Sequence, residues 1–363
     1  MLKSLVLVVP GRLQTRSGGY GYDRRIAAGL GELGWSVAVR ELDDSFPRPS
    51  AQARDEAVRV LASIPDGATV LVDGLALGAL PAEVEREAAR LRLVALVHHP
   101  LAAETGIDAR SAIELEASER RALAAVRQVV VTSRATADAL ARYGVDRHRV
   151  AVVEPGTDRA PSAHGSGDGP VQLLCVAALI PRKGHHLLFR ALASIPHRHW
   201  RLTCVGSLTR HQATAEQLRG LLCAEGLGDR VDLAGEVDAR SLARHYETAD
   251  VFVLPTLYEG YGMAVAEALA RGLPIVSTAT GAIPALVGPV GPVGDQAGII
   301  VTPGDVNALS SALAQLLNEG GAEVRERLAQ GARRVRERLP TWDAAATEMA
   351  AVLDRVAEVT SGG

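Results

Sequence analysis

The chain has 363 residues, which is too many for one ordinary hydrophobic core and suits two domains of roughly 150–200 residues each. Its hydrophobic fraction of 47% and charged fraction of 22% are typical of a soluble globular protein and exclude a disordered, fibrous or disulfide-stapled chain. The net charge of -3 gives no broad attraction to nucleic acid or anionic lipid, and an aromatic fraction of 3% argues against stacking platforms for single-stranded nucleic acid.

The cysteines and the N-terminus indicate a cytoplasmic protein. Cys175, Cys204 and Cys223 form no C-x-x-C pair, and we interpret Cys175 and Cys204, which lie inside apolar runs, as buried thiols. Such thiols are typical of a reducing cytoplasm. Residues 1–9 are too short for a signal peptide and read as a first strand, and no stretch reaches the roughly 18 apolar residues that span a membrane.

Short apolar runs alternate with helical patterns through the first part of the chain. The runs cover residues 5–9, 37–39, 70–72, 93–97, 129–131 and 150–153. They are apolar at every position, which indicates strands buried on both faces of a parallel sheet. Amphipathic segments such as 81–92 and 108–127 lie between them. We therefore predict a doubly wound, Rossmann-like α/β domain over residues 1–160.

The same pattern restarts after residues 157–170, a stretch rich in Gly, Pro and Ser that we predict to link two domains. Six more strand candidates cover residues 171–176, 202–205, 231–233, 251–254, 275–277 and 299–301. They predict a second Rossmann-like domain over residues 171–340, facing the first across a cleft. The tail, 341–363, is helical with one apolar face, and we expect it to pack back onto the first domain.

The stretch 251–274 is the most informative part of the sequence. A buried strand leads into a loop with Gly260 and Gly262, and a helix is predicted to begin near Met263. A glycine-bearing loop that leads into a helix N-terminus presents free N–H groups and a positive dipole end to an anion. The stretch therefore predicts a binding site for a pyrophosphate.

Two carboxylates bracket this turn. Glu259 lies in the loop, and Glu267 lies one turn into an otherwise apolar helix. Glu267 and Arg271 have the i,i+4 spacing of a surface ion pair, and Glu259 has the position of a helix cap. The functional interpretation is that one carboxylate binds sugar hydroxyls and the other a ribose diol, because two carboxylate oxygens match a vicinal diol.

Glu259, the seven residues after it and Glu267 resemble the signature of retaining GT-B glycosyltransferases, the nucleotide-sugar-dependent enzymes of glycosyltransferase family four, or group one. Residues 280–284 resemble the family's glycine turn, and residues 298–305 resemble the strand and loop that follow it. The motifs are specific because they occur together and in this order. The resemblance extends through the second domain.

The resemblance implies roles for the residues of this stretch. Glu259 would lie near the donor sugar, and Glu267 would bind the donor ribose. The backbone that follows Glu259 would contact the sugar or the phosphates, which assigns Gly260, Tyr261, Gly262 and Met263 to donor binding.

A second loop, at residues 177–184, places Arg182 and Lys183 before Gly184. Two cations at the carboxyl end of a strand can neutralise a diphosphate leaving group, although a solvated basic turn would have the same composition. The resembling family has a lysine just before this glycine, and Lys183 matches it. The family also has an arginine near the strand end, where this sequence has Ala178, so either Arg182 takes that place or the neutralisation is weaker.

In the first domain, Gly18 and Gly19 lie between the first strand and the following helix. A dinucleotide-binding fingerprint would need a third glycine where Arg24 stands, so that interpretation fails. The segment resembles the family's Gly-Gly loop over the diphosphate, and the alternative is a plain tight turn.

His98 ends a buried strand and is followed by His99. A metal site is not expected there, because adjacent histidines rarely share one ion and no further ligand with suitable spacing is evident. The family's histidine after this strand contacts the donor sugar, and His98 matches it best. The alternative is a hydrogen-bonded structural histidine.

These observations predict an enzyme that transfers a hexosyl group from a UDP- or GDP-sugar to a soluble acceptor. The resemblance implies retention by front-face substitution, with His98, Lys183 and Glu259 as catalytic residues and with no metal or cofactor. We expect no nucleic-acid partner and no membrane association, and leave open whether the chain forms a homo-oligomer. The alternatives are an epimerase-type or catalytically silent nucleotide-sugar-binding protein, a glycoside phosphorylase and a glycoside hydrolase, of which the last would leave Lys183 unexplained.

Overall fold

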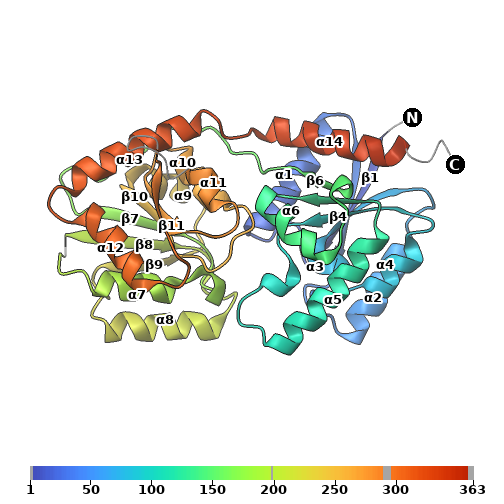
Figure 1. The fold of residues 1–363 in the computed structure, drawn as a ribbon, viewed down its shortest axis with the longest axis horizontal. Helices are drawn as coiled ribbons and strands as arrows, with labels where there is room; N and C mark the ends of the chain where they lie inside the picture. Colours follow the sequence, from blue (N-terminus) through green and yellow to red (C-terminus); the bar gives the residue numbers. More distant parts are fainter. Residues whose placement is uncertain (1–2, 198, 289–295, 359–363) are drawn as a thin grey trace. The chain divides into compact units, whose positions relative to one another are not determined.

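The computed structural model describes residues 3–197, 199–288 and 296–358. Its internal contacts divide the chain into two compact units. Unit 1 comprises Met1–Gly156 and Pro340–Gly363, and unit 2 comprises Thr157–Leu339. Each unit is a parallel sheet flanked by helices, which confirms the predicted α/β fold with two doubly wound sheets (Figure 1).

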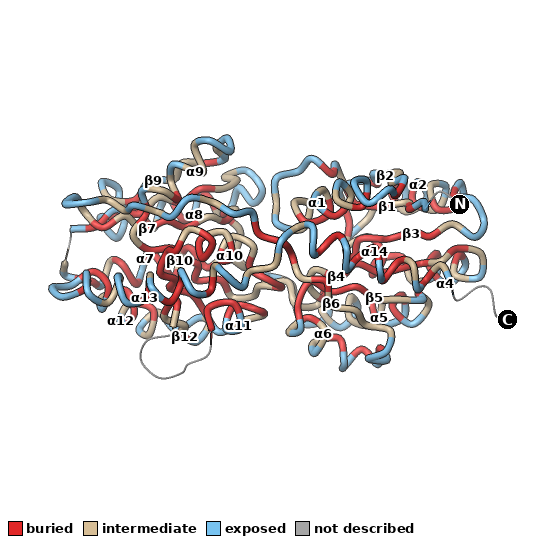
Figure 2. Tube along the Cα trace, turned by 90° about the horizontal axis from the view of Figure 1, so that it is seen from above, coloured by how far each residue is buried: buried red, intermediate tan, exposed pale blue. Residues whose placement is uncertain are grey.

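The sheet of unit 1 has six parallel strands in the order β2-β1-β3-β4-β5-β6. Their bounds are β1 (Ser4–Pro10), β2 (Ser36–Leu42), β3 (Thr69–Asp73), β4 (Arg92–Val97), β5 (Gln128–Val131) and β6 (Val150–Val152). Each strand lies on a predicted apolar run. The central strands β3, β4 and β5 are buried almost throughout, as expected for strands covered on both faces (Figure 2).

The helices of unit 1 cover both faces of this sheet. Their bounds are α1 (Gly18–Glu32), α2 (Ala51–Ala62), α3 (Gly74–Leu77), α4 (Pro81–Glu87), α5 (Ala109–Ala125), α6 (Arg134–Leu140) and α14 (Trp342–Glu358). Apolar residues of α2, α4 and α5 share one core with the strands.

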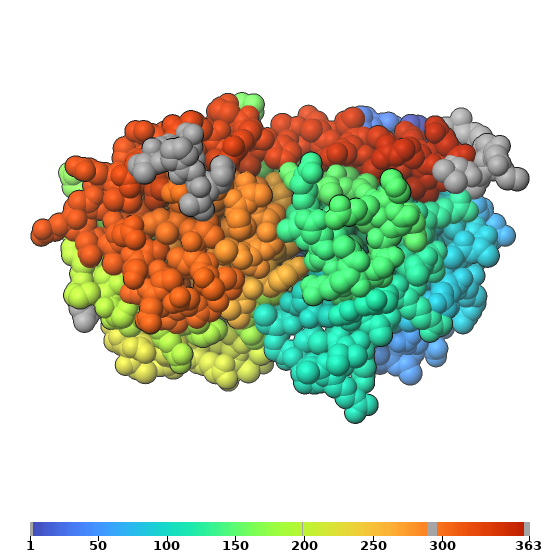
Figure 3. All heavy atoms as spheres, in the orientation of Figure 1, coloured from blue at the N-terminus to red at the C-terminus, as the bar shows by residue number. Residues whose placement is uncertain are grey.

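The C-terminal helix α14 packs against α1 within unit 1, and its outer surface is visible in red in Figure 3. The side chains of Ala345, Met349, Val352 and Val356 are all buried, as their helical spacing predicts. Gly29 of α1 allows the close approach, because a Cβ atom there would lie 2.6 Å from the Cβ atom of Ala346. The helix therefore completes the core of unit 1, although it follows unit 2 in the sequence.

The sheet of unit 2 also has six parallel strands, in the order β12-β11-β10-β7-β8-β9. Their bounds are β7 (Val171–Val176), β8 (Trp200–Val205), β9 (Val231–Gly235), β10 (Val251–Leu254), β11 (Ile275–Thr278) and β12 (Gly298–Val301). All six lie on the apolar runs that predicted them. The central strand β10 pairs with β7 on one side and with β11 on the other, which brings their carboxyl ends to one edge.

Seven helices of unit 2 lie among the described residues. Their bounds are α7 (His185–Ala193), α8 (Gln212–Ala224), α9 (Ala239–Thr248), α10 (Met263–Leu269), α11 (Ile283–Val287), α12 (Val306–Leu317) and α13 (Gly321–Arg336). The core beneath them includes the large side chains of Phe189, Trp200, Tyr246 and Phe252, all essentially inaccessible to solvent. No helix in the described part of the chain is both long and apolar enough to cross a membrane.

The segment 157–170, predicted to be a linker, has neither helix nor strand but is bound to unit 2. The backbone N–H of Ala163 donates to the carbonyl of Arg271, and that of His164 to the carbonyl of Glu247, each at 2.9 Å. The carboxylate of Asp250 accepts the N–H groups of Ser166 and Gln172 at 3.1 and 2.7 Å. The second half of the segment is thus part of the packed unit rather than a free tether.

Candidate functional site

Three loops meet at the carboxyl edge of the unit 2 sheet, after β7, β10 and β11. A Cβ atom on Gly184, in the first loop, would lie 2.1 Å from the carbonyl oxygen of Pro255 in the second. A Cβ atom on Gly281, in the third, would lie 1.4 Å from the carbonyl oxygen of Glu259. Only glycine fits at these two positions, so the sequence enforces a close assembly of the three loops.

Lys183 and Glu259 form an ion pair across the first two of these loops. The Nζ atom of Lys183 lies 2.5 Å from Oε2 of Glu259, and the two side chains are 16% and 14% exposed. The N-cap residue of α10 is Gly262 and not Glu259, whose carboxylate binds Lys183. The structure thus brings together two of the three residues predicted to be catalytic.

Arg182 ties the same two loops together through the backbone. Its carbonyl accepts the N–H of Leu257 at 2.8 Å and the hydroxyl of Thr256 at 3.1 Å. Its guanidinium Nη1 donates to the carbonyl of Tyr258 at 2.8 Å. Arg182 therefore positions the Glu259 loop, and its contact with phosphate stays a prediction.

The backbone after Glu259 turns directly into α10. Gly262 has a φ of +100°, a left-handed conformation that favours glycine, and a Cβ atom there would lie 3.6 Å from Cγ of Glu259. Tyr261 is buried, and Met263 begins the helix half-buried. The predicted donor-binding residues Gly260, Tyr261, Gly262 and Met263 therefore lie between Glu259 and the helix that carries Glu267.

Glu267 is oriented by a tyrosine that the sequence analysis missed. The hydroxyl of Tyr246, on α9, donates to Oε2 of Glu267 at 2.9 Å. Arg271 donates to the backbone carbonyl of Glu267 at 2.9 Å, and its guanidinium lies 4.3 Å from the centre of the Tyr246 ring. The suggested surface ion pair between Glu267 and Arg271 is therefore replaced by a half-buried carboxylate that Tyr246 orients.

Burial raises the pKa of Glu267, against the hydrogen bond from Tyr246 and the charge of Arg271, which both lower it. The carboxylate is not turned into bulk solvent. A carboxylate has about four acceptor positions, so the single bond from Tyr246 leaves capacity for a ligand with hydroxyl groups.

In unit 1, His98 lies between two buried carboxylates. Its Nε2 atom is 3.1 Å from Oδ1 of Asp23, on α1, and 3.6 Å from Oδ2 of Asp73, at the end of β3. The ring also makes an edge contact with Tyr22, with the ring centres 5.4 Å apart. The sequence predicted His98 as a site residue without partners, whereas the structure groups it with Asp23 and Asp73.

This cluster contains two carboxylic acids and one imidazole, and their proximity shifts the pKa values of Asp73 and His98. Burial, together with the charge of Asp23, raises the pKa of Asp73 to about 7. Burial lowers the pKa of His98, but Asp23 and Asp73 outweigh it, and the pKa of His98 is raised overall. Asp73 could have been found from the sequence, because an acid there ends a buried strand, whereas Asp23 lies inside a helix without any motif.

The prediction that Gly18 and Gly19 form a loop is wrong, because both lie in a helix. Gly18 and Gly19 form the first turn of α1, because Ser17 acts as N-cap and its hydroxyl accepts the N–H of Tyr20 at 3.4 Å. Gly19 nevertheless faces His98: a Cβ atom there would lie 3.3 Å from Cδ2 of the ring. The glycine pair thus allows the helix to approach the histidine.

Two groups among the described residues have the donor atoms of a metal site within 4.8 Å of one another. One is Asp23, Asp73 and His98 in unit 1. The other, in unit 2, consists of Cys175, His185 and Cys204. The first coincides with the candidate site, and the second lies within the sheet and under α7.

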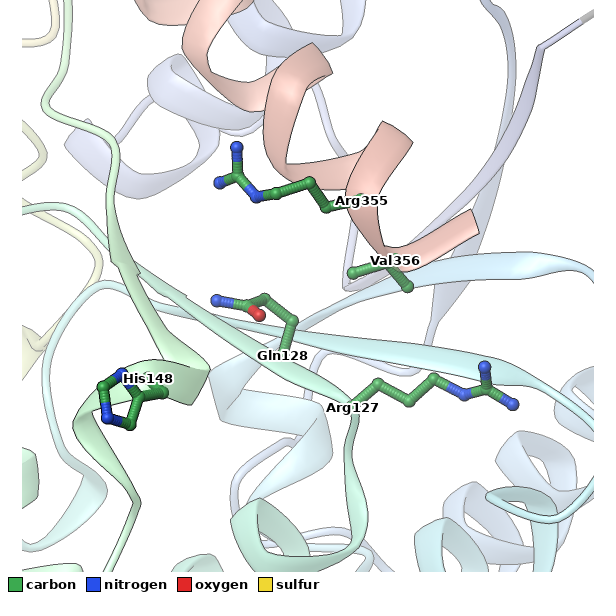
Figure 4. Close-up of a pocket in the computed structure, with 5 residues that line it drawn as sticks. All are labelled: Arg127, Gln128, His148, Arg355 and Val356. Carbon is green, nitrogen blue, oxygen red and sulfur yellow. The ribbon is translucent and has the colours of Figure 1, made fainter. Parts of the chain in front are cut away.

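Unit 1 also has a cavity of about 410 Å³ lined by Arg127, Gln128, His148, Arg355 and Val356 (Figure 4). Because β5 begins at Gln128, this pocket lies at the amino edge of the sheet, whereas His98 follows the carboxyl end of β4. It contains none of the predicted site residues.

Comparisons with protein families cover most of the chain. Residues 157–335 match the family model of group 1 glycosyl transferases, and residues 73–160 match that of glycosyltransferase family 4. Together these two matches include every candidate site residue except Gly18, Gly19 and Asp23.

Among characterised relatives, the chain is 28% identical to the MMP alpha-(1->4)-mannosyltransferase of Mycolicibacterium hassiacum, over 89% of this chain and 80% of that protein. It is 33% identical to the D-inositol 3-phosphate glycosyltransferase of Xylanimonas cellulosilytica, over 67% of this chain and 59% of that protein.

Solved structures share the fold. The sucrose-phosphate synthase of Thermosynechococcus elongatus aligns with a TM-score of 0.81 and 22% identity, covering 99% of this chain and all of that one. HepE of Anabaena, in complex with UDP-glucose, aligns with a TM-score of 0.76 and 17% identity, covering 97% of this chain and 99% of that one.

Proposed function

Because this chain belongs to the group 1 and family 4 glycosyltransferases, we propose that it transfers a hexosyl group from a UDP- or GDP-sugar to a soluble acceptor with retention of configuration. The observation that carries the donor assignment is the Lys183–Glu259 pair, held beside the Glu267 helix at the carboxyl edge of the unit 2 sheet. Ligands of open parallel sheets bind outside this edge.

Lys183 serves the leaving diphosphate. Lys183 lies two residues before His185, the first residue of α7, and its ammonium is fixed by Glu259, so it is already oriented before any ligand binds. A positive group placed where negative charge develops stabilises the transition state without reorganising when the reaction occurs. Glu259 holds the ammonium in place, and carboxylate oxygens are acceptors that suit sugar hydroxyls.

Glu267 binds the donor ribose. Its carboxylate is desolvated and oriented by Tyr246, which favours a directional contact with a vicinal diol over a contact with water. Such pre-orientation reduces the entropy that a donor must lose on binding. A bound diol would donate hydrogen bonds to the charged form of Glu267. Such bonds favour the charged form, so binding of the diol would lower the pKa that burial has raised.

The transfer itself needs no protein nucleophile. In front-face substitution, the bond from the anomeric carbon to the diphosphate oxygen breaks, the bond to the acceptor oxygen forms on the same face, and the departing phosphate takes the acceptor's proton. Lys183 stabilises the charge on the diphosphate, and His98 contacts the donor sugar. Since the cation at Lys183 belongs to the protein, we propose that a chelator leaves turnover unchanged.

A donor screen tests this proposal. The protein is incubated with UDP- and GDP-hexoses and a panel of soluble acceptors, while nucleoside diphosphate release and the anomeric configuration of the product are measured. The proposal requires acceptor-dependent release from at least one donor and an axial product from an axial donor. Release with inversion would contradict the retaining assignment.

Ala178 supports a second candidate, a catalytically silent nucleotide-sugar-binding protein. The family pattern has an arginine at this position, and Arg182, the residue that could take its place, donates from Nη1 to the carbonyl of Tyr258. Donor binding in calorimetry without release from any acceptor in the screen would favour this candidate over the enzyme.

A further inference from the structure

Two thiols and one imidazole, none of them assigned to the donor, meet in the core of unit 2. Cys175 on β7 and Cys204 on β8 are direct partners in the parallel register. His185 is the first residue of α7, which follows the loop after β7. The three residues are 0%, 0% and 1% exposed.

The donor atoms of these residues are already close to a ligating arrangement. The three atoms lie within 4.8 Å of one another, and Sγ of Cys175 is 3.6 Å from Nε2 of His185. Metal–sulfur bonds of about 2.3 Å and metal–nitrogen bonds of about 2.0 Å place the ligands of a three-coordinate ion about 3.5–4.0 Å apart. The cluster therefore needs shifts of less than about an ångström to close on an ion.

The surroundings of His185 give a second reason to assign a ligand. Its Nδ1 atom has no hydrogen-bond partner among the described residues, and its Nε2 atom faces the sulfur of Cys175. Buried polar atoms in proteins nearly always have a partner, and a sulfur is a weak one. Coordination through Nε2 would replace its weak contact with sulfur by a metal bond, in a region from which water is excluded, and would leave the ring proton on Nδ1.

The donor set favours one class of ion. The group contains no fourth Cys, His, Asp or Glu ligand among the described residues, whereas structural zinc sites are almost always four-coordinate. Thiolate ligands select soft ions such as Cu(I). Two thiolates and a neutral imidazole around a monovalent ion carry one negative charge, which the positive N-terminal end of α7 stabilises.

We propose that Cys175, Cys204 and His185 form a buried three-coordinate site for a soft monovalent cation, with Cu(I) as its best match. The two thiols each give up a proton when the ion binds, and no electron is transferred. The ion would tie the first turn of α7 to β7 and β8. Lys183, two residues before His185, would then be held more firmly.

The test measures metal binding and does not depend on the proposed transferase activity. The full chain carries Cys223→Ser, which removes the exposed thiol, and is titrated without oxygen with Cu(I) in competition with bathocuproine disulfonate. We expect one Cu(I) per chain, and X-ray absorption should show two sulfur neighbours at about 2.2–2.3 Å and one nitrogen neighbour at about 2.0 Å.

Variants locate the site. Cys175→Ala, Cys204→Ala and His185→Gln, each in the Cys223→Ser background, should weaken Cu(I) binding at least tenfold. His186→Gln is the matched control, because this half-buried neighbour of His185 is outside the cluster. Circular dichroism and thermal unfolding confirm that each variant folds, and a variant that does not fold is replaced by its serine or asparagine counterpart.

Three results would overturn the proposal. The first is a Cys223→Ser protein that retains no Cu(I) against the competitor. The second is equal loss of binding in His185→Gln and His186→Gln. The third is a four-coordinate Zn²⁺ complex that excludes Cu(I) at equal concentrations.

Discussion

The candidate sites of the two units handle charge differently. In unit 2, the Lys183 ammonium faces the Glu259 carboxylate, so one basic group is paired with one acidic group. In unit 1, two buried carboxylates face one imidazole, and the pKa of Asp73 rises to about 7 because of burial and the neighbouring Asp23. Unit 2 therefore holds a fixed charge, the Lys183 ammonium kept in position by Glu259, whereas the charge of the unit 1 site changes with pH near neutrality.

The sites also differ in how they are assembled. The unit 2 site lies on neighbouring loops that two glycines hold in contact. The unit 1 site draws Asp23 from α1, Asp73 from the end of β3 and His98 from the loop after β4. Substitutions in unit 2 should therefore change the charge and orientation of Lys183 and its partners. Substitutions in unit 1 should change the protonation of Asp73 and His98.

The fixed charge of unit 2 is tested by Lys183→Ala. We expect kcat/KM to fall by about 10²–10³-fold, because a preorganised group aimed at developing charge is worth about 2.7–4 kcal/mol. Steady-state kinetics with the donor found in the screen measure the effect. Lys3→Ala is the control, since Lys3 is the chain's other lysine and forms an exposed pair with Asp354. Turnover within threefold of the unaltered enzyme would remove Lys183 from the mechanism.

The proton sensitivity of unit 1 extends to Glu119 on α5. Burial raises its pKa from 4.5 to about 7, and its Oε2 atom accepts the N–H of Leu101 at 2.9 Å. Between these two pKa values the unfolded chain loses this proton while the folded chain keeps it, so the free energy of unfolding falls as pH rises from 4.5 to 7. Above pH 7 the Glu119 carboxyl causes no further decrease in the free energy of unfolding.

Glu119→Gln removes this titration and keeps an acceptor for Leu101. We expect the variant to be more stable than the unaltered protein by up to about 3 kcal/mol at pH 8, and by little at pH 4.5. Urea unfolding at the two pH values measures the difference. Glu114→Gln, in an exposed pair with Arg110, should change stability by less than about 1 kcal/mol at both. A lower stability of Glu119→Gln at pH 8 would contradict the assignment.

Asp23→Asn tests whether the acids of unit 1 control His98. The charge of Asp23 and its hydrogen bond both raise the pKa of His98, so the variant should lower that pKa, as read from the imidazole signals in NMR spectra. We expect kcat to fall by about tenfold, because the ring loses the partner that orients it. A His98 pKa that is unchanged or higher would show that Asp23 does not act through the histidine.

The smallest expected effect is that of Tyr246→Phe in unit 2. The change removes one hydrogen bond to Glu267, worth about 0.5–1.5 kcal/mol, so donor affinity should fall by about 3- to 10-fold. Calorimetric titration with the donor measures it, and KM for the acceptor should not change. An unchanged donor affinity would mean that Glu267 does not need Tyr246 to orient it.

Much of the fold follows from local sequence. All twelve predicted strands exist, the six of unit 1 on runs that are apolar at every position and the six of unit 2 on mostly apolar runs, and α14 was predicted from its apolar face. The start of α1 was missed, since the glycine pair indicated a loop while the cap at Ser17 decided the structure. The packing of residues 163–166 on unit 2 depends on Asp250, which is remote in sequence and which no local pattern reveals.

The candidate site was predictable where its residues are adjacent in the chain. Glu259 and Glu267 share one strand–loop–helix stretch. Lys183 stands next to Gly184, which packs against the start of the same stretch at Pro255. The partners Tyr246 and Asp23 lie inside helices, on no motif, and only the tertiary structure brings them to Glu267 and His98. The ion pair between Lys183 and Glu259 was also missed, because the sequence assigned each of them a contact with the donor and none with the other.

The central claim, that Glu267 binds the donor ribose, is tested by titrating the donor into the unaltered protein and into Glu267→Ala in a calorimeter. A second titration uses the donor analogue without the 2′ and 3′ hydroxyls. We expect the variant to bind the natural donor at least about tenfold more weakly, since hydrogen bonds to a charged group are worth about 1.5–3 kcal/mol, and both proteins to bind the analogue equally. Equal affinity of the two proteins for the natural donor would contradict it.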